Sequence, residues 1–211
     1  MKNVLAKVWH IIRWPLLALF LLYAALVAYR IPIVAQKNNS DKIVAYIHAQ
    51  KITMADVMGE SLPPAPDQAA NDATLAGIDA NKNGIRDDVE LAIFKKYPNL
   101  PKIRAAELQY AKALQLELTQ VTDSNTLVAA IQEEDRASLC ITGTAPKVTL
   151  SDSDTKIKSA LALSDARKKE VEILIFNTDQ RKQKQQSIYQ KYMTSYSDPN
   201  VAGCDIDPSS S

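Results

Sequence analysis

The sequence predicts an all-α protein in which one apolar N-terminal helix precedes a small helical bundle. Glycine is scarce, at 5 of 211 residues, whereas Ala, Leu, Gln, Lys and Glu, which favour helices, are common. Apolar residues recur at spacings of three and four along several segments, and strand signals are weak. The length suits one membrane segment followed by one modest domain with its own core.

The N-terminal region has the composition of a membrane segment. Residues 14–29 carry no charge, and apolar residues follow Arg30. Such a helix is roughly 24 Å long, and Arg13 and Arg30 can extend to the two interfaces of a hydrocarbon core of about 30 Å. We predict an uncleaved signal anchor in residues 1–35, which contacts the membrane through residues 14–35. A cleaved signal peptide and a buried core helix are the alternatives.

Charge is spread unevenly along the chain. No acidic residue precedes Asp41, and four of the 25 basic residues lie in the first 30 positions. The remainder therefore has 21 basic and 24 acidic residues, a net charge of −3. Because a mildly acidic domain has no electrostatic attraction to phosphates, we expect no nucleic-acid partner.

Residues 36–70 are expected to connect the membrane segment to the bundle. The polar residues 36–40 predict a short tether, and Asp41 is a candidate cap for a short helix with Ile47 on its apolar side. The Pro-rich residues 61–67 predict an extended, stiff arm.

Four helices are expected after this arm, and the last three belong to a bundle of residues 99–211. The second has an apolar stripe, so one face should pack against the core. Ser151 and Asp154 have the spacing of a capping box at the start of the fourth helix, which is expected to break near residues 164–165. An irregular tail should follow residue 195. The predicted helices span residues 88–97, 101–121 and 151–192, and the third begins near residue 124 and ends at residues 143–146. The stripe contains Ile103, Ala106, Tyr110, Leu114, Leu118 and Val121.

The chain has two cysteines, Cys140 and Cys204. Neither lies in a Cys-x-x-Cys motif, so the spacing supports no zinc or redox site. In an oxidising compartment they would form a disulfide that joins the tail to the end of the third predicted helix. Closing such a loop stabilises the fold by roughly 4 kcal/mol in the chain-entropy model. Two unpaired thiols are the alternative.

The segment GIDANKNGIRDDVE, residues 77–90, places oxygen-bearing side chains two residues apart. Calcium prefers six to eight oxygen ligands at roughly 2.3–2.6 Å, which a short loop with a central glycine can supply. Gly84 would permit the sharp bend, and Ile85 would contribute its backbone carbonyl. The expected ligands are Asp79, Asn81, Asn83, Ile85, Asp87 and Glu90.

The run D-A-N-K-N-G-I-R-D followed by Glu90 resembles an EF-hand-type calcium loop. Within that class it is most similar to the thrombospondin type 3-like loops of exported bacterial proteins, which read D-x-D-x-D-G-[IV]-x-D. The resemblance covers about 12 of the 211 residues, and residues 74–97 are similar in character to uncharacterised bacterial envelope proteins. It implies one Ca²⁺ site within residues 71–98 and carries almost no information about activity.

The loop departs from a paired EF-hand in three respects. Arg86 stands where a paired loop has an aliphatic residue, no second loop is present, and only Asp79, Asp87 and Glu90 carry negative charge. These departures imply a single structural site with a Kd of about 10⁻⁴–10⁻³ M, as in extracellular modules. The alternative is a polar turn in which Asp87 caps the next helix and Glu90 completes a capping box.

Catalytic signals are weak. Ser153 and Lys156 have the Ser-x-x-Lys spacing without its companion motifs, which predicts helix capping. The acidic run 133–135 and the basic run 181–184 are expected to be solvated helix faces. No phosphate-binding or dinucleotide-binding fingerprint is present.

These features predict a membrane-anchored, exported calcium-binding protein with a structural or interaction role. It would cross the inner membrane once and place its C-terminal domain in the periplasm or outside the cell, because the cysteine pair and the calcium loop both suit an exported domain. Its partner would be an unidentified envelope protein. The alternatives are a cell-envelope hydrolase that uses the carboxylates near the calcium loop, and a scaffold without metal.

Overall fold

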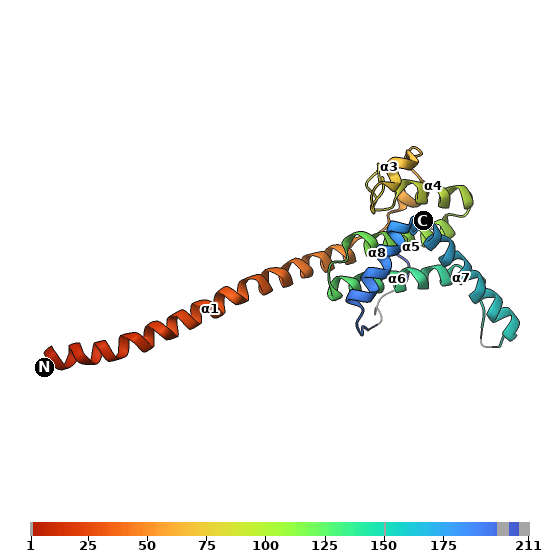
Figure 1. Cartoon of the computed structure of the whole chain (residues 1–211). Coiled ribbons are helices and arrows are strands. Elements are labelled where there is room, and N and C mark those ends of the chain that lie inside the picture. The colour runs from red at the N-terminus through yellow and green to blue at the C-terminus, as the bar shows by residue number, and fades with distance from the viewer. Residues whose placement is uncertain (1, 150, 198–202, 207–211) are drawn as a thin grey trace. The chain divides into compact units, whose positions relative to one another are not determined.

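The computed structural model describes residues 2–149, 151–197 and 203–206, and the chain divides into two compact units, Met1–Lys42 and Ile43–Ser211. All regular elements in these residues are α-helices (Figure 1), which confirms the predicted fold class of an apolar N-terminal helix followed by a helical bundle. The helices are α1 (Lys2–Ala49), α2 (Met54–Met58), α3 (Gln68–Asp72), α4 (Asp87–Lys96), α5 (Pro101–Gln120), α6 (Ser124–Gly143), α7 (Asp154–Ile175) and α8 (Asp179–Tyr192).

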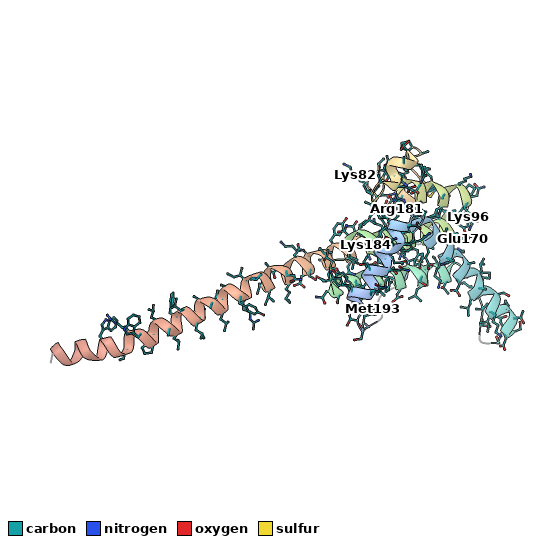
Figure 2. All side chains as sticks on the ribbon, viewed as in Figure 1. Lys82, Lys96, Glu170, Arg181, Lys184 and Met193 are labelled. Atoms are coloured by element: carbon teal, nitrogen blue, oxygen red, sulfur yellow. A yellow bond between two sulfur atoms is a disulfide. The ribbon has the colours of Figure 1, made fainter. Side chains whose placement is uncertain are left out.

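Helix α1 is continuous, and its stretch Ile12–Ala49 is long and apolar enough to cross a membrane by length and composition. The apolar side chains of this stretch project from the helix along its length (Figure 2). A signal sequence has the same character. The predicted tether at residues 36–40 and the new helix at Asp41 are wrong, because α1 continues through both. Neither Gly nor Pro interrupts this polar segment, so nothing in it ends a helix that is already formed.

Helix α5 is the central helix of the second unit and contacts α2, α4, α6, α7 and α8. The prediction of a single apolar stripe is too narrow, because every residue from Arg104 to Leu118 is buried. Six polar or charged residues are consequently enclosed and need partners inside the protein. They are Arg104, Glu107, Gln109, Lys112, Gln115 and Glu117.

The main core lies around α5 and includes side chains from the predicted calcium loop. Ile85 and Val89 are fully buried in it, beside Leu108 and Leu114 of α5. A second cluster joins α5, α6 and α8 through Val121, Leu127 and Ile188. A third confirms the expected apolar side of the segment around Ile47, which packs against Leu116 and Ala129.

Helix α7 corrects two details of the sequence prediction. Its N-cap is Ser153, whose side chain accepts a hydrogen bond from the Lys156 amide, so the capping role of Ser153 is confirmed and that of Ser151 is wrong. The helix also continues through residues 164–165, where Ser164 Oγ donates to a carbonyl one turn earlier. The break comes later, before Thr178, which caps α8.

The two short helices α2 and α3 lie outside the prediction, although each has a recognisable start. Thr53 and Asp56 form a reciprocal capping box at α2. Asp67 caps α3 by accepting a hydrogen bond from the Ala70 amide. Such caps satisfy backbone donors that have no partner inside the helix.

Buried arginines join the ends of the helices to one another. Arg104 donates to Val57 O at the end of α2 and to Tyr97 O after α4. Arg167 donates to Ile141 O near the end of α6. Guanidinium groups suit this role because they present several donors in a fixed plane to carbonyls at the negative end of a helix.

Arg181 on α8 contradicts the prediction that residues 181–184 form a solvated face (Figure 2). Its side chain is 0 % exposed. The guanidinium ion-pairs with the Asp72 carboxylate at 2.8 Å and also donates to four other acceptors. They are the carbonyls of Asn71, Thr74 and Leu75 and the Asn177 amide oxygen. The helical register, which the composition of the run does not reveal, turns Arg181 inward and Lys182 outward.

The acidic run 133–135 is also more enclosed than predicted. Glu133 is buried and binds Lys51 at 2.8 Å, Arg136 at 2.7 Å and His48 at 2.9 Å. The next carboxyl, Glu134, has one oxygen buried without a hydrogen-bond partner. The prediction of a solvated face is therefore wrong for both residues.

The disulfide between Cys140 and Cys204 is present, as predicted. It attaches residues 203–206 to α6 near the C-terminal end of that helix. The predicted irregular tail is described only at residues 195–197 and 203–206, where no helix forms. The rest of that prediction lies outside the described residues.

Candidate metal site in the loop Asp79–Glu90

The candidate metal loop, Asp79–Glu90, follows Gly77. Any other residue at this position would force the Arg86 side chain to move. Gly77 has φ of 68°, and a Cβ there would lie 2.1 Å from Arg86 Cδ. Within the loop, Gly84 has φ of 85° and Lys82 has φ of 59°. The positive φ at Gly84 agrees with the bend that the sequence placed at this position.

Asp79 and the two asparagines organise the backbone of the turn. The Asp79 carboxylate accepts hydrogen bonds from the amides of Asn83 at 3.1 Å and Gly84 at 2.9 Å. Asn83 Oδ1 accepts from the Ile85 amide at 2.9 Å, and Asn81 Oδ1 accepts from the Asn83 amide at 3.3 Å. The even spacing of these residues therefore lets each of the three side chains accept hydrogen bonds from backbone amides of the turn.

Glu90 faces this turn from the first part of α4. Its two carboxylate oxygens accept from Asn81 Nδ2 and Asn83 Nδ2, both at 3.0 Å. Glu90 is 1 % exposed, and burial raises the pKa of its carboxyl to about 7. No basic side chain among the described residues forms a hydrogen bond or ion pair with it. A buried carboxylate without a cation is costly, so this position favours either a proton or a positive ion.

Asp87 is a second buried carboxyl that points back to the loop. Its Oδ1 accepts from the Ala80 amide at 3.0 Å, and its Oδ2 has no hydrogen-bond partner. Burial raises the pKa of the Asp87 carboxyl, with Asp79 as a further negative neighbour. The predicted alternative of a capping box does not form, because Asp87 is already helical and the N-cap residue, Arg86, makes no side-chain cap bond.

Arg86 explains one departure from a paired EF-hand. Its fully buried side chain donates to Leu174 O at 2.5 Å and to Ile175 O at 3.1 Å, at the C-terminal end of α7. It also pairs with the Asp88 carboxylate beside it. The loop is thus fixed to the bundle through Arg86.

Other contacts hold the loop against α5 and the Pro-rich arm. Gln115 Nε2 donates to Ala76 O at 2.8 Å, just before the loop. Asn81 Nδ2 donates to Ser61 O at 3.0 Å, which connects the loop to the arm. A conformational change in the loop would therefore alter its contacts with both the Pro-rich arm and the bundle.

The loop offers the oxygen-bearing side chains that a calcium ion prefers. In the structure, however, these side chains are not oriented as a closed coordination shell around one point. Within the described part of the chain, no three His, Cys, Asp or Glu side chains are grouped closely enough to hold a metal ion. Between the carboxylates stand the amide groups of Asn81 and Asn83, with nitrogen toward Glu90. If these two amides turned their oxygens inward, they would join the unpaired Asp87 oxygen and Glu90 in an all-oxygen site, the ligand type that Ca²⁺ prefers.

No protein-family model, curated protein or solved structure matches the chain.

A group of buried acids lies elsewhere in the bundle, and sequence reasoning missed it. Glu117 of α5 is 0 % exposed and lies beside Glu134 of α6, with Tyr189 of α8 nearby. Burial raises the pKa of both carboxyls, and the neighbouring Glu117 carboxyl raises the pKa of Glu134 further. Acidic residues on the predicted third helix and on the apolar second helix were the available signal, but only the packing shows that they meet.

A hollow of about 370 Å³ opens beside this acidic group rather than beside the metal loop. Tyr110 Oη donates to Glu172 Oε1 at 3.1 Å at its edge. The lining residues are Tyr110, Glu134, Asp135, Ser138, Asp165, Lys168, Lys169 and Glu172.

Proposed function

We propose that this chain is a membrane-anchored calcium-binding protein in which one Ca²⁺ ion has a structural role. The ion would be held by Asp79, Asn81, Asn83, Asp87, Glu90 and the backbone carbonyl of Ile85. It would order the junction between the Pro-rich arm and the helical bundle, because the loop contacts both. The ordered domain would present a binding surface to an unidentified envelope protein.

One observation carries this proposal: two buried carboxyls face the turn, and neither forms an ion pair with a basic side chain among the described residues. The Glu90 carboxylate accepts hydrogen bonds from two neutral amides, and one buried oxygen of Asp87 has no hydrogen-bond partner. Buried polar groups are normally paired, and unpaired ones cost roughly 1–3 kcal/mol or more when charged. A divalent cation would satisfy both carboxyls together, whereas a polar turn leaves this cost unexplained.

The proposed location is the inner membrane, with the second unit on the periplasmic or extracellular side. The apolar stretch of α1 supports a membrane anchor. The disulfide supports an oxidising compartment for the domain that contains it. Extracellular calcium levels would also fill a site of millimolar or slightly higher affinity.

The direct test is the thermal midpoint of the full-length protein in detergent, with Ca²⁺ or with excess chelator. At about 10 mM Ca²⁺ and a Kd of about 10⁻⁴–10⁻³ M, binding to the folded state adds roughly 1.4–2.7 kcal/mol. For a domain of this size we expect a rise in Tm of about 3–10 °C.

Asp79→Ala is the matched variant for this test, and we expect it to lose the calcium-dependent rise. Mg²⁺ at the same concentration controls for ionic strength, because its smaller shell suits this ligand set less well. Equal midpoints with Ca²⁺ and chelator in the parent protein would contradict the proposal and favour the metal-free scaffold.

Calcium affinity should also depend on pH through Glu90. In the metal-free protein the pKa of Glu90 is raised to about 7. Glu90 therefore binds a proton more tightly in the folded protein than in the unfolded chain. That proton competes with the ion, so we expect the calcium Kd to weaken about tenfold from pH 8 to pH 6. Calorimetric titration in buffers of different ionisation enthalpy should show proton release at pH 6–7. An affinity that is constant across this range would remove Glu90 from the ligand set.

The hydrolase alternative needs acids that converge on a cleft. The acids that line the hollow of about 370 Å³ are Glu134, Asp135, Asp165 and Glu172, and none of them belongs to the metal loop. No observation thus favours catalysis by the loop carboxylates, and the enzyme alternative stays a prediction from the sequence.

A further inference from the structure

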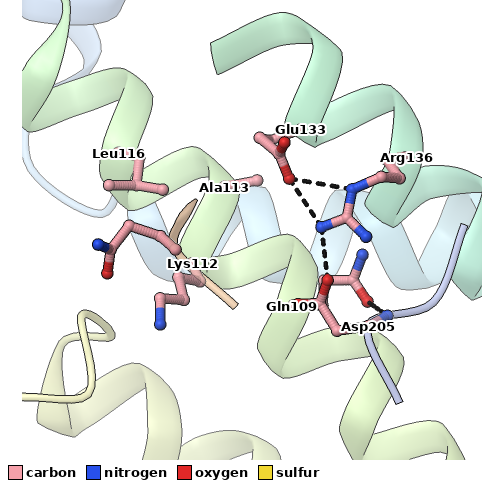
Figure 3. Close-up of a pocket in the computed structure, with 8 residues that line it drawn as sticks. Gln109, Lys112, Ala113, Leu116, Glu133, Arg136 and Asp205 are labelled. Carbon is pink, nitrogen blue, oxygen red and sulfur yellow. Dashed lines mark hydrogen bonds and ion pairs between the residues drawn. The ribbon is translucent and has the colours of Figure 1, made fainter. Parts of the chain in front are cut away.

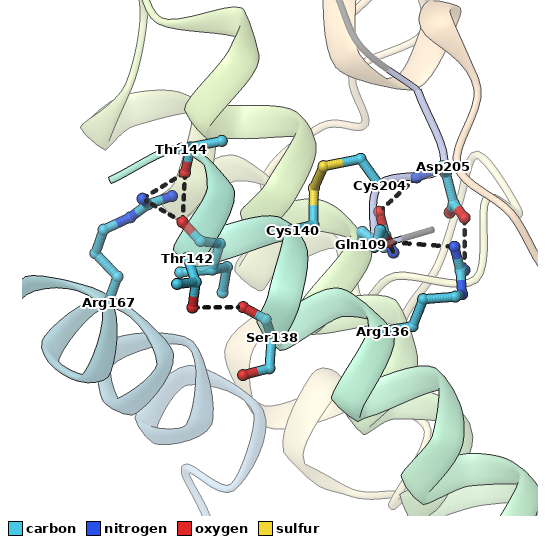
Figure 4. The surroundings of a disulfide bond; sticks show 11 residues. Gln109, Arg136, Ser138, Cys140, Thr142, Thr144, Arg167, Cys204 and Asp205 are labelled. Carbon is cyan, nitrogen blue, oxygen red and sulfur yellow. Dashed lines mark hydrogen bonds and ion pairs between the residues drawn. A yellow bond between two sulfur atoms is a disulfide. The ribbon is translucent and has the colours of Figure 1, made fainter. Parts of the chain in front are cut away.

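The C-terminal strap, residues 203–206, lies along α5 and α6 and is attached by the disulfide to Cys140 (Figure 4). Gln109 of α5 holds its backbone from both directions. Gln109 Nε2 donates to Gly203 O at 2.7 Å, and Gln109 Oε1 accepts from the Asp205 amide at 2.9 Å. Ile206 packs against the main core.

The strap places the Asp205 carboxylate into a pocket between α5 and α6 (Figure 3). Its Oδ1 lies 2.5 Å from an Arg136 guanidinium nitrogen and 3.9 Å from Lys51 Nζ. Its Oδ2 accepts from the Ile52 amide at 3.0 Å. The side chain is 2 % exposed. A guanidinium, an ammonium and a backbone amide are the groups that proteins use to bind a carboxylate ligand.

Without Asp205 this pocket would be positively charged. Lys51, Lys112 and Arg136 contribute three positive charges around it, and Glu133 contributes one negative charge. Lys112 Nζ donates to Lys51 O at 2.9 Å, which keeps this cation at the pocket. Only about 10 Å³ remains free, so the Asp205 carboxylate both neutralises and fills the site.

The two sulfurs differ in accessibility. Cys140 is 2 % exposed, within α6, whereas Cys204 on the strap is exposed. A thiolate can therefore approach the disulfide from the strap side. The other strap contacts are non-covalent, so the disulfide is the only covalent link between the strap and the pocket among the described residues.

We propose that this pocket is a carboxylate-binding site, that Asp205 is its built-in occupant, and that the disulfide is a latch. A dithiol reductant would attack the disulfide at Cys204, release Cys140 as a thiol and form a mixed disulfide. Its second thiol would then free Cys204, so that the reductant leaves as a disulfide and both protein cysteines hold a proton. The released strap leaves Arg136, Lys51 and the Ile52 amide available to a carboxylate on an acidic peptide of another chain.

Hydrogen exchange on the full-length protein in detergent tests the latch. After reduction with dithiothreitol, we expect exchange at the strap and at the Ile52 amide to become at least tenfold faster, with α5 and α6 unchanged. Unchanged protection of the strap after reduction would overturn the proposal. Loss of protection throughout α5 and α6 would also overturn it, because the disulfide would then hold the fold rather than a strap.

Two variants separate the carboxylate from the latch. Cys204→Ala should behave as the reduced protein does, without any reductant. Asp205→Asn keeps the disulfide and the shape of the side chain, and we expect it to increase exchange at the Ile52 amide several-fold. No change at Ile52 in Asp205→Asn would mean that the carboxylate does not occupy a site.

The ligand class is tested with a capped tetrapeptide of sequence Gly-Ser-Asp-Ile, with Gly-Ser-Asn-Ile as its control. The Asp peptide at millimolar concentration should restore protection of the Ile52 amide in the reduced protein and have no effect on the oxidised protein. Equal effects of the two peptides, or none from either, would overturn a carboxylate-specific site.

Discussion

Arg181→Ala should cause the largest loss of stability of any single substitution considered for this protein. The substitution removes a fully buried guanidinium and leaves three backbone carbonyls and the Asp72 carboxylate without their donor. Removing one partner from a buried charged network typically costs about 3–5 kcal/mol. We expect the Tm of the full-length protein to fall by roughly 6–20 °C.

Two further variants test the reason for this loss. Lys182→Ala changes the exposed neighbour on the same helix and should leave the midpoint within about 1–2 °C. Arg181→Lys keeps the charge but loses the planar set of donors, so it should recover only part of the stability. Similar thermal midpoints for Arg181→Ala and Lys182→Ala would show that the hydrogen bonds from Arg181 to residues 71–75 do not form in solution.

Glu134→Gln should make the protein more stable at alkaline pH. Glu134 and Glu117 come from adjacent helices, and burial followed by the neighbouring Glu117 carboxyl raises the pKa of Glu134 well above its ordinary value. The folded protein therefore binds a proton at Glu134 more tightly than the unfolded chain does. Gln supplies a permanent N–H donor in place of that proton. We expect a gain of about 1–3 kcal/mol at pH 8.

The sign of the pH dependence follows from proton binding. Above the unfolded pKa of 4.5 the folded parent protein binds more protons than the unfolded chain, so its stability falls as pH rises until the raised folded pKa is reached. Near pH 4 both states are protonated, and Glu134→Gln should have little effect. The charged or titratable groups that face the pair are Tyr110 of α5, Asp135 of α6, Glu172 of α7 and Tyr189 of α8.

Denaturant unfolding at pH 4, 6 and 8 measures this prediction directly. Glu60→Gln is the matched control, because Glu60 is exposed and the same substitution there should change stability by less than about 0.5 kcal/mol at every pH. A loss of stability in Glu134→Gln at pH 8 would mean that the carboxyl is ionised and paired with a cation in solution.

The sequence alone predicted the features that depend on local pattern. The apolar stretch in α1, the span of α5 and the start of α6 follow from composition and from periodicity, which act over neighbouring residues. The six candidate ligands were named from their spacing, and the structure brings Asn81, Asn83 and Glu90 into direct contact. Cysteine count and compartment were enough to predict the disulfide.

Tertiary structure decided which polar residues are buried and what they contact. The burial of Arg181, Glu117 and Glu134 could not be read from their own segments, because each depends on another helix that lies far away in the sequence. The position of Arg86 likewise became meaningful only when its side chain was seen at the end of α7. Helical periodicity identifies an apolar face, but a helix enclosed on all sides, such as α5, has no solvent face, and its polar partners are set by packing.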